Sequence, residues 1–322
     1  MSSSIASYLQ LLEFKLKVYA ASGNSYQDLF SAVMSYSLDD FKQVRPFAGD
    51  GGNDGYVKSR GWYFQIYGPE ILTSESSVTK TAREKIRADF IKLLENWDNI
   101  KRYIFVFNDR FGGIPTPLVV AIEKLGNEYP EIEFDCFSSR NLLANFLALK
   151  DIHKNDIVGI LISDDNCYKY DYSAIVKVLE GLTKTNRGEL YFDISLTAPD
   201  LVKKIKFNGL SMQISDLIKI KSRNVSLLDD YFKSSPSDEQ QVAIQMQELY
   251  ANSKKVIPNT DENYEDLRYL WIRKKMIPLE IMETVRLSPP LSLAYNDASD
   301  LVIAKYFESC DIYEPPTSID SE

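Results

Sequence analysis

Residues 47–70 read FAGDGGNDGYVKSRGWYFQIYGPE, and this stretch decides the fold that we predict for the chain. Its glycine cluster lets the backbone turn sharply and delivers Asp54 at a strand edge. An aromatic strand from Gly61 to Tyr67 follows, with side chains that alternate between two faces. Gln65 and Tyr67 share the face from which Asp54 approaches. The stretch therefore predicts a β-hairpin that brings Asp54 and Gln65 together, with their side chains converging on one cleft.

The sequences on either side of this hairpin predict alternating helices and strands. Apolar residues three or four positions apart predict helices over residues 4–21 and 25–43. After the hairpin, the pattern predicts a helix over 79–97, a strand over 103–108, a helix over 117–129, a strand over 132–137 and a helix over 139–149. This order indicates an α/β fold built on a mixed sheet.

The rest of the chain has a different character. After residues 151–161, which we interpret as a connection, residues 181–195 indicate a strand pair, and beyond Pro199 the pattern is mainly helical with breaks rich in serine and proline. We therefore predict an α/β domain over 1–160 and a mainly α-helical interaction domain over 161–313. Prolines, serines and acidic residues predict a disordered tail over 314–322.

Composition limits the compartment and the partners. The 322 residues are 44% hydrophobic, which is enough for two domains with cores, and the formal charge is −9. Residues 1–160 hold 18 Lys and Arg against 20 Asp and Glu, whereas the remainder holds 19 against 26. This balance argues against a protein coated by nucleic acid and leaves room for a local basic groove.

Cysteines and hydropathy point to the cytoplasm. Cys136, Cys167 and Cys310 are widely spaced, so neither a disulfide framework nor a zinc site is indicated. His153 is the only histidine, and no serine elbow or paired cysteine accompanies it for nucleophilic catalysis. No apolar run approaches the length of a membrane span. We expect a soluble, cytoplasmic protein with no membrane partner.

Four motifs carry a resemblance to known families: SGNSYQDL over 22–29, GDGGNDGY over 49–56, YFQIYGPE over 63–70 and FVFNDRFGG over 105–113. The glycine-rich turn and the strand end Gln65-Ile66-Tyr67 resemble the Mrr-like branch of the PD-(D/E)xK nuclease superfamily. From about Gly23 to Gly159, the chain more closely resembles the N-terminal domains of proteins from bacterial ABC-three-component defence systems. The resemblance implies a restriction-endonuclease-like mixed-sheet core.

The resemblance also implies a set of site residues. Asp54, Gln65 and the backbone carbonyl of Ile66 would hold Mg²⁺, because this cation takes oxygen ligands. Gln27 stands where nuclease relatives often carry a glutamate, and Tyr67 stands where they carry a lysine. The resemblance allows Lys80 or Lys85 of the next helix to replace that lysine. Asp50 and Glu70 are further carboxylates near in sequence. Without the resemblance, Asp54 is better interpreted as a turn aspartate bonded to nearby amides.

The predicted helix over 79–97 is rich in cations. Lys80, Arg83, Lys85 and Arg87 are either a phosphate-facing stripe that binds double-stranded DNA or a solvated face supported by i,i+4 ion pairs.

Two functions remain open from the sequence. The first is a Mg²⁺-dependent endonuclease acting on DNA in an anti-phage system, with Asp54, Gln65, Lys80 and Gln27 as catalytic candidates. The second is a catalytically inactive nuclease-fold scaffold or sensor subunit of a multi-component defence complex. The resemblance implies separately encoded ATPase subunits as partners in both cases, and a homo-oligomer stays open.

Overall fold

The computed structural model describes residues 2–44, 52–70, 75–159, 170–184, 200–309 and 311–316. These residues form two compact units. One is Glu13–Val158, and the other joins Met1–Leu12 to Gly159–Glu322.

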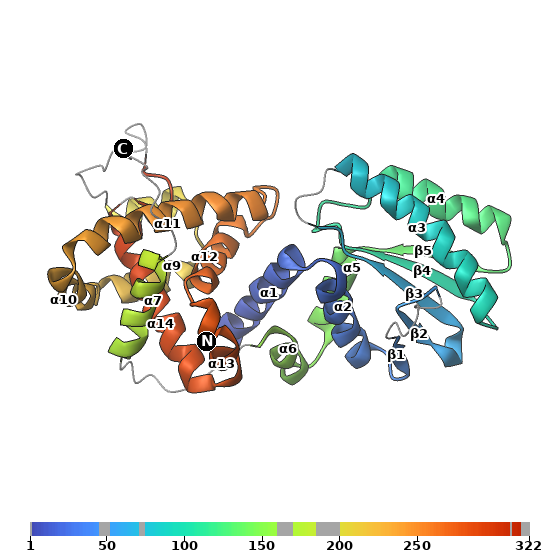
Figure 1. Cartoon of the computed structure of the whole chain (residues 1–322), viewed down its shortest axis with the longest axis horizontal. Helices are drawn as coiled ribbons and strands as arrows, with labels where there is room; N and C mark the ends of the chain where they lie inside the picture. Colours follow the sequence, from blue (N-terminus) through green and yellow to red (C-terminus); the bar gives the residue numbers. More distant parts are fainter. Residues whose placement is uncertain are drawn as a thin grey trace. The chain divides into compact units, whose positions relative to one another are not determined.

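Unit Glu13–Val158 is an α/β domain with a five-stranded mixed sheet, which confirms the predicted fold class at that level (Figure 1). The strand order is β1-β2-β3-β4-β5. β1, β2 and β3 pair antiparallel, whereas β3, β4 and β5 pair parallel. The elements up to the end of this unit are α1 (Ser2–Ala20), α2 (Gly23–Ser37), β1 (Phe41–Gln43), β2 (Gly55–Val57), η1 (Lys58–Arg60), β3 (Trp62–Tyr67), α3 (Glu75–Asn96), β4 (Arg102–Phe107), α4 (Thr116–Glu128), β5 (Glu133–Phe137), α5 (Ser139–Ala148) and α6 (Asp151–Val158).

Helices cover both faces of this sheet (Figure 1). α3 and α4 bury alternate residues of β3 and β4, among them Tyr63, Tyr103 and Phe105, in one hydrophobic cluster. On the opposite face, Phe30 of α2 contacts Phe64 of β3, with ring centroids 5.5 Å apart. The predicted period-two alternation of the central strand is therefore confirmed.

Two glycines explain why the turn before β2 is glycine-rich. Gly52 has φ +88°, and a Cβ atom there would lie 2.3 Å from the carbonyl oxygen of Asp89 in α3. A Cβ atom on Gly55 would lie 2.7 Å from the ring of Phe41 in β1. Backbone conformation and close packing therefore account for glycine at both positions.

Two predicted boundaries are wrong. The helix predicted over 25–43 ends at Ser37, because the backbone of residues 41–43 pairs with β2 instead of continuing the helix. Residues 151–158, interpreted as a connection, form α6.

In the described residues of the second unit, every regular element is a helix, which confirms the prediction of a mainly helical C-terminal region. Helix α14 packs against α7, α9 and α12. The strand pair predicted over residues 181–195 is wrong at its start, because residues 181–184 are the last turn of α7; the remainder, including residues 186–188, lies outside the described residues. The helices of this part are α7 (Tyr172–Lys184), α8 (Leu201–Phe207), α9 (Met212–Ser222), α10 (Ser226–Ser234), α11 (Pro236–Val256), α12 (Tyr264–Lys275), η2 (Leu279–Ile281), α13 (Met282–Leu287) and α14 (Pro289–Glu308).

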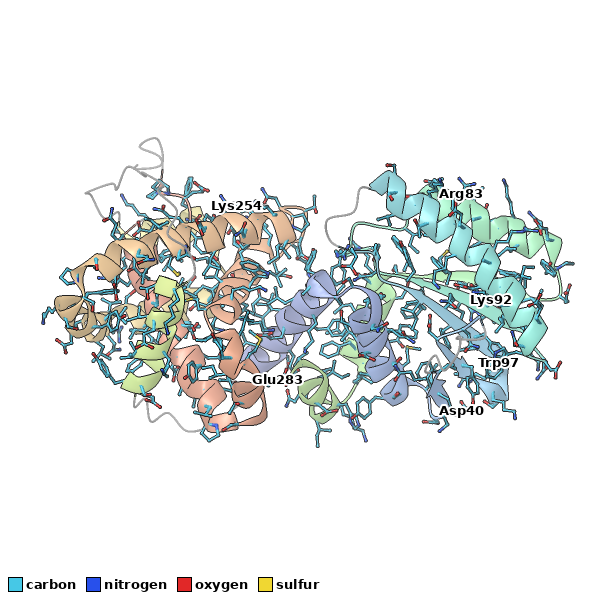
Figure 2. All side chains as sticks on the ribbon, in the orientation of Figure 1. Asp40, Arg83, Lys92, Trp97, Lys254 and Glu283 are labelled. Atoms are coloured by element: carbon cyan, nitrogen blue, oxygen red, sulfur yellow. The ribbon has the colours of Figure 1, made fainter. Side chains whose placement is uncertain are left out.

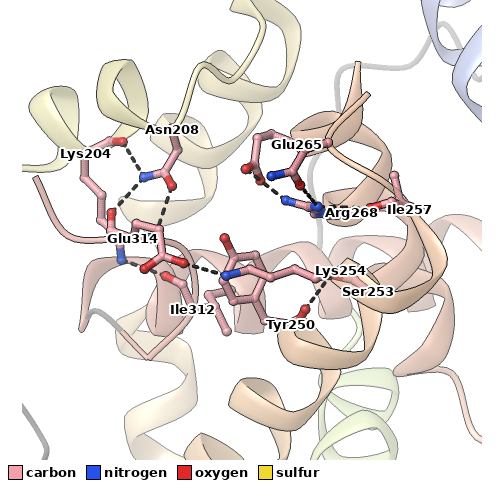
Figure 3. A network of polar contacts seen from close by, with 11 residues as sticks. Lys204, Asn208, Tyr250, Ser253, Lys254, Ile257, Glu265, Arg268, Ile312 and Glu314 are labelled. Atoms are coloured by element: carbon pink, nitrogen blue, oxygen red, sulfur yellow. Dashed lines mark hydrogen bonds and ion pairs between the residues drawn. The ribbon is translucent and has the colours of Figure 1, made fainter. Parts of the chain in front are cut away.

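Buried polar side chains hold the segment after α14 in place (Figure 3). Lys204 Nζ donates to the carbonyl oxygens of Phe307, at 2.6 Å, and Ile312, at 2.7 Å. The side chain of Asn208 donates to the Glu314 carbonyl and accepts from the Glu314 N–H. Glu314, the first residue of the predicted tail, is thus bound to α8, while residues 317–322 lie outside the described residues.

Candidate functional site

The structure brings together four of the residues that the sequence singled out. Asp54 directly precedes β2 and stands beside the end of β3. Its Oδ2 atom accepts hydrogen bonds from Gln65 Nε2 and from the Ile66 N–H, both at 2.7 Å. Its Oδ1 atom accepts from Gln27 Nε2 of α2 at 3.2 Å. Asp54 and Gln65 are 7% and 0% exposed, so this cluster, the Asp54 cluster, is buried.

These residues do not fit a magnesium ion in the arrangement that the structure shows. Mg²⁺ needs octahedral oxygen ligands at about 2.0–2.1 Å. Gln65 and Gln27 present amide nitrogens to Asp54, and Ile66 presents its N–H, so hydrogen-bond donors occupy both carboxylate oxygens. Within the residues that the structure describes, no group of three His, Cys, Asp or Glu side chains is placed to hold a metal. The Asp54 cluster surrounds a carboxylate with hydrogen-bond donors.

Of the two additional carboxylates, only Glu70 belongs to the described residues. Glu70 Oε2 accepts a hydrogen bond from Ser22 Oγ, at the start of α2, at 3.1 Å. Asp50 lies outside the described residues.

The lysines proposed to replace the missing catalytic lysine lie on different faces of α3. Lys85 Nζ pairs with buried Asp89 Oδ2 at 2.6 Å, and its charge acts on Tyr67. Burial raises the pKa of Tyr67 above its ordinary value, so this phenol stays protonated near neutral pH and is a poor general base. Lys80 lies instead with Arg83 and Arg87 on the side of α3 that faces α4.

That side of α3 borders a groove, which we call the α3–α4 groove. Its volume is about 1020 Å³, and a hollow of about 710 Å³ shares four of its lining residues. Arg87 donates to both carboxylate oxygens of Glu128 across the groove, at 2.9 and 3.0 Å. The groove is lined by Lys80, Arg83, Glu84, Ile86, Arg87, Ala88, Ile91, Thr116, Pro117, Val120, Ala121, Lys124, Leu125 and Glu128.

The predicted DNA-binding stripe is therefore divided. Lys80, Arg83 and Arg87 line the α3–α4 groove, whereas Lys85 is paired elsewhere. The pairing of Lys85 with Asp89 is the i,i+4 contact of the alternative interpretation. Figure 2 labels Arg83 on α3 among the side chains of this unit.

A second polar cluster, which sequence reasoning missed, explains the FVFNDRFGG motif. Asn108, 1% exposed, follows β4 and donates to the carbonyl oxygens of Val18 and Ala21 at the end of α1. Its own Oδ1 atom accepts from Ser139 Oγ of α5 at 3.0 Å. Asn108 thus ties together three parts of the unit.

The next two residues of the motif extend these ties. Asp109 accepts from the N–H groups of Ser139 and Gly113, at 2.8 and 2.9 Å. Arg110, at φ +46°, donates to the carbonyl oxygen of Pro69 just after β3. The motif therefore has a structural role at the carboxyl ends of the parallel strands. The left-handed φ values of Arg110 and Phe111 could not be predicted from the residue types.

The helical unit contains a buried acid with a shifted pKa (Figure 3). Burial raises the pKa of Glu265 to about 7, although Arg268 lies 3.2 Å from its carboxylate.

No described helix of the chain combines the length and apolarity that crossing a bilayer requires.

Comparison with known proteins identifies the C-terminal region. No curated protein and no solved structure gives a significant match. One family model does match, over residues 173–314, which begin in α7 and end at the Glu314 bound by Asn208. The chain therefore carries a region similar to C-terminal domain 10 of the ABC-three component (ABC-3C) systems, which supports its association with these defence systems.

Proposed function

We propose that this chain is a non-catalytic subunit of an ABC-3C defence assembly, whose nuclease-like N-terminal domain binds other components instead of cleaving DNA. The observation that carries this proposal is the state of Asp54. Three amide groups donate to its two carboxylate oxygens, so the carboxylate serves as an acceptor that joins α2, β2 and β3. A buried carboxylate satisfied in this way stabilises the fold.

The Mg²⁺-dependent endonuclease remains the competing hypothesis. It needs the Asp54 carboxylate to exchange its amide N–H donors for a cation, and it needs a lysine close to the scissile phosphate. Lys85 is paired with Asp89, and Tyr67 occupies the position of the lysine in relatives. The ABC-3C match supports partner subunits in either case, and the ATPase partners belong to the proposal.

Asp54→Asn separates the two functions. The asparagine keeps an acceptor for Gln65 and Ile66, and Gln27 can turn its amide to match the new NH₂ group. The charge needed to hold Mg²⁺ is lost. Because the role of Asp54 is structural, we expect this variant to protect cells against phage as well as the unmodified chain does when the whole system is expressed.

The measurement pairs a plaque assay with thermal unfolding of the purified chain. Asp54→Ala is the matched variant, because it removes the acceptor as well as the charge, and we expect it to lose both stability and protection. Loss of protection in Asp54→Asn with an unchanged melting temperature would instead support the endonuclease.

A further inference from the structure

The α3–α4 groove has an apolar floor that is open to solvent. Val120 of α4 is 40% exposed, and Ile91 of α3 is half-buried. Ala88, Pro117 and Ala121 continue this apolar surface along the groove. The volume of about 1020 Å³ is slightly larger than the range of about 300–1,000 Å³ that small-molecule sites span. A channel between two helices with an apolar floor is the shape that receives an amphipathic helix.

The charges around this floor are unequal along its length. At one end, Arg87 and Glu128 neutralise each other. Among the described residues, Lys80, Arg83 and Lys124 have no ion-pair partner. The adjoining hollow is lined by Lys80 and Arg83 and by no acidic residue. Glu84 is the other acid of the groove lining, so Lys80, Arg83 and Lys124 leave this part of the groove with a net positive charge.

We propose that the α3–α4 groove docks an amphipathic helix of a partner protein, whose apolar face lies on Val120 and Ile91 and whose acidic residues meet Lys80 and Arg83. This inference deepens the assembly part of the proposed function by naming the surface and the chemistry of the partner. Duplex DNA suits the site less well, because phosphates would contact the three unpaired cations and leave the apolar floor in water. The chain's charge of −9 also opposes nucleic acid.

Site-specific photo-crosslinking tests the proposal. A benzoylphenylalanine replaces Val120 in the chain purified together with the components of its own system. Val119 is the matched control position, because it is 36% exposed on the same helix and does not line the groove. We expect position 120 to crosslink to an acidic partner segment with apolar residues at helical spacing. We expect position 119 to crosslink to it at least about tenfold less.

Charge reversal supplies the second measurement. Lys80→Glu with Arg83→Glu should lower the crosslink at position 120 by about tenfold, the change that about 1.4 kcal/mol of lost binding free energy produces. Lys203→Glu with Lys206→Glu, on exposed positions of α8, makes the same change of charge elsewhere and should leave the crosslink unchanged.

Several results would overturn the proposal. A crosslink to DNA would make the groove a nucleic-acid interface, and a crosslink to a second copy would make it a self-association surface. No crosslink above the level at position 119 would leave the groove without an occupant and refute docking. The Asp54→Asn assay is independent of these results, because a catalytic domain would fail that assay and still give the crosslink.

Discussion

Replacement of Asp54 by alanine should destabilise unit Glu13–Val158 by an amount that the Asp54 cluster sets. The variant removes the acceptor of the Gln65 amide and of the Ile66 N–H, both buried and both bonded at 2.7 Å. A buried donor left without a partner costs about 1–3 kcal/mol, so the two together cost about 2–6 kcal/mol. Gln27 is only part-buried and adds less. Since a domain is stable by about 5–15 kcal/mol, this loss is a large share of the total.

Urea unfolding, monitored by tryptophan fluorescence, measures this loss of stability in unit Glu13–Val158. The chain has three tryptophans, and Trp271 lies in the helical unit. In a Trp271→Phe background, fluorescence comes from Trp62 and Trp97, which both belong to unit Glu13–Val158. Asp54→Asn, measured in parallel, should lower the free energy of unfolding by less than about 1.5 kcal/mol. The asparagine keeps an acceptor, and only the extra strength that a charged acceptor gives to the hydrogen bonds is lost.

Two outcomes would refute this reasoning. If Asp54→Ala unfolds within about 0.5 kcal/mol of the unmodified chain, the carboxylate is not needed for the fold. If Asp54→Asn loses as much as Asp54→Ala, the negative charge itself stabilises the Asp54 cluster, and a neutral acceptor does not replace it.

Gly52→Ala should destabilise the chain by more than Gly113→Ala in thermal unfolding, because both have positive φ but only at Gly52 would the new Cβ atom meet backbone, 2.3 Å away; equal losses would contradict this. Lys204→Met should cost about 1–3 kcal/mol and raise hydrogen exchange after α14, because two carbonyl oxygens lose their donor, whereas exposed Lys203→Met should change neither. Burial raises the pKa of Glu265 from its ordinary 4.5 to about 7, so the folded chain keeps a proton that the unfolded chain releases. The free energy of unfolding should therefore fall as pH rises from about 4.5 to 7. Urea unfolding at several pH values should show that this fall is smaller in Glu265→Gln; an equal fall in the variant would mean that another group causes the pH dependence.

Local pattern was enough to predict the centre of the α/β unit. Period-two alternation placed Tyr63 on the face that α3 covers, and the glycine-rich turn placed Asp54 opposite Gln65. Strand β1 was missed, because three residues carry little pattern and Phe41 continues the helical spacing of the preceding apolar residues. Only its pairing with residues 55–57 makes it a strand.

In the candidate sites too, contacts between residues close in sequence could be predicted, whereas contacts between distant residues could not. Lys85 and Asp89 are four positions apart in the sequence, so their ion pair could be predicted from helical spacing. The contact between Arg87 and Glu128 spans 41 residues and depends on how α4 packs. Spacing alone therefore could not distinguish the cations that line the groove from Lys85, which is paired with Asp89. The bonds of Asn108 to α1 span 87 and 90 residues, and no local pattern announces them.

The split of α1 between the two units has a consequence for synthesis on the ribosome. Residues 1–12 group with the helical unit, where Tyr8 donates a hydrogen bond to Asp266, 258 residues later. At about 5–20 residues per second, Asp266 is made roughly 10–50 s after Tyr8. Unit Glu13–Val158 is continuous in sequence and can fold during that interval. Residues 1–12 thus leave the ribosome well before the residues that they contact, and a chaperone that binds nascent chains can hold them during that interval.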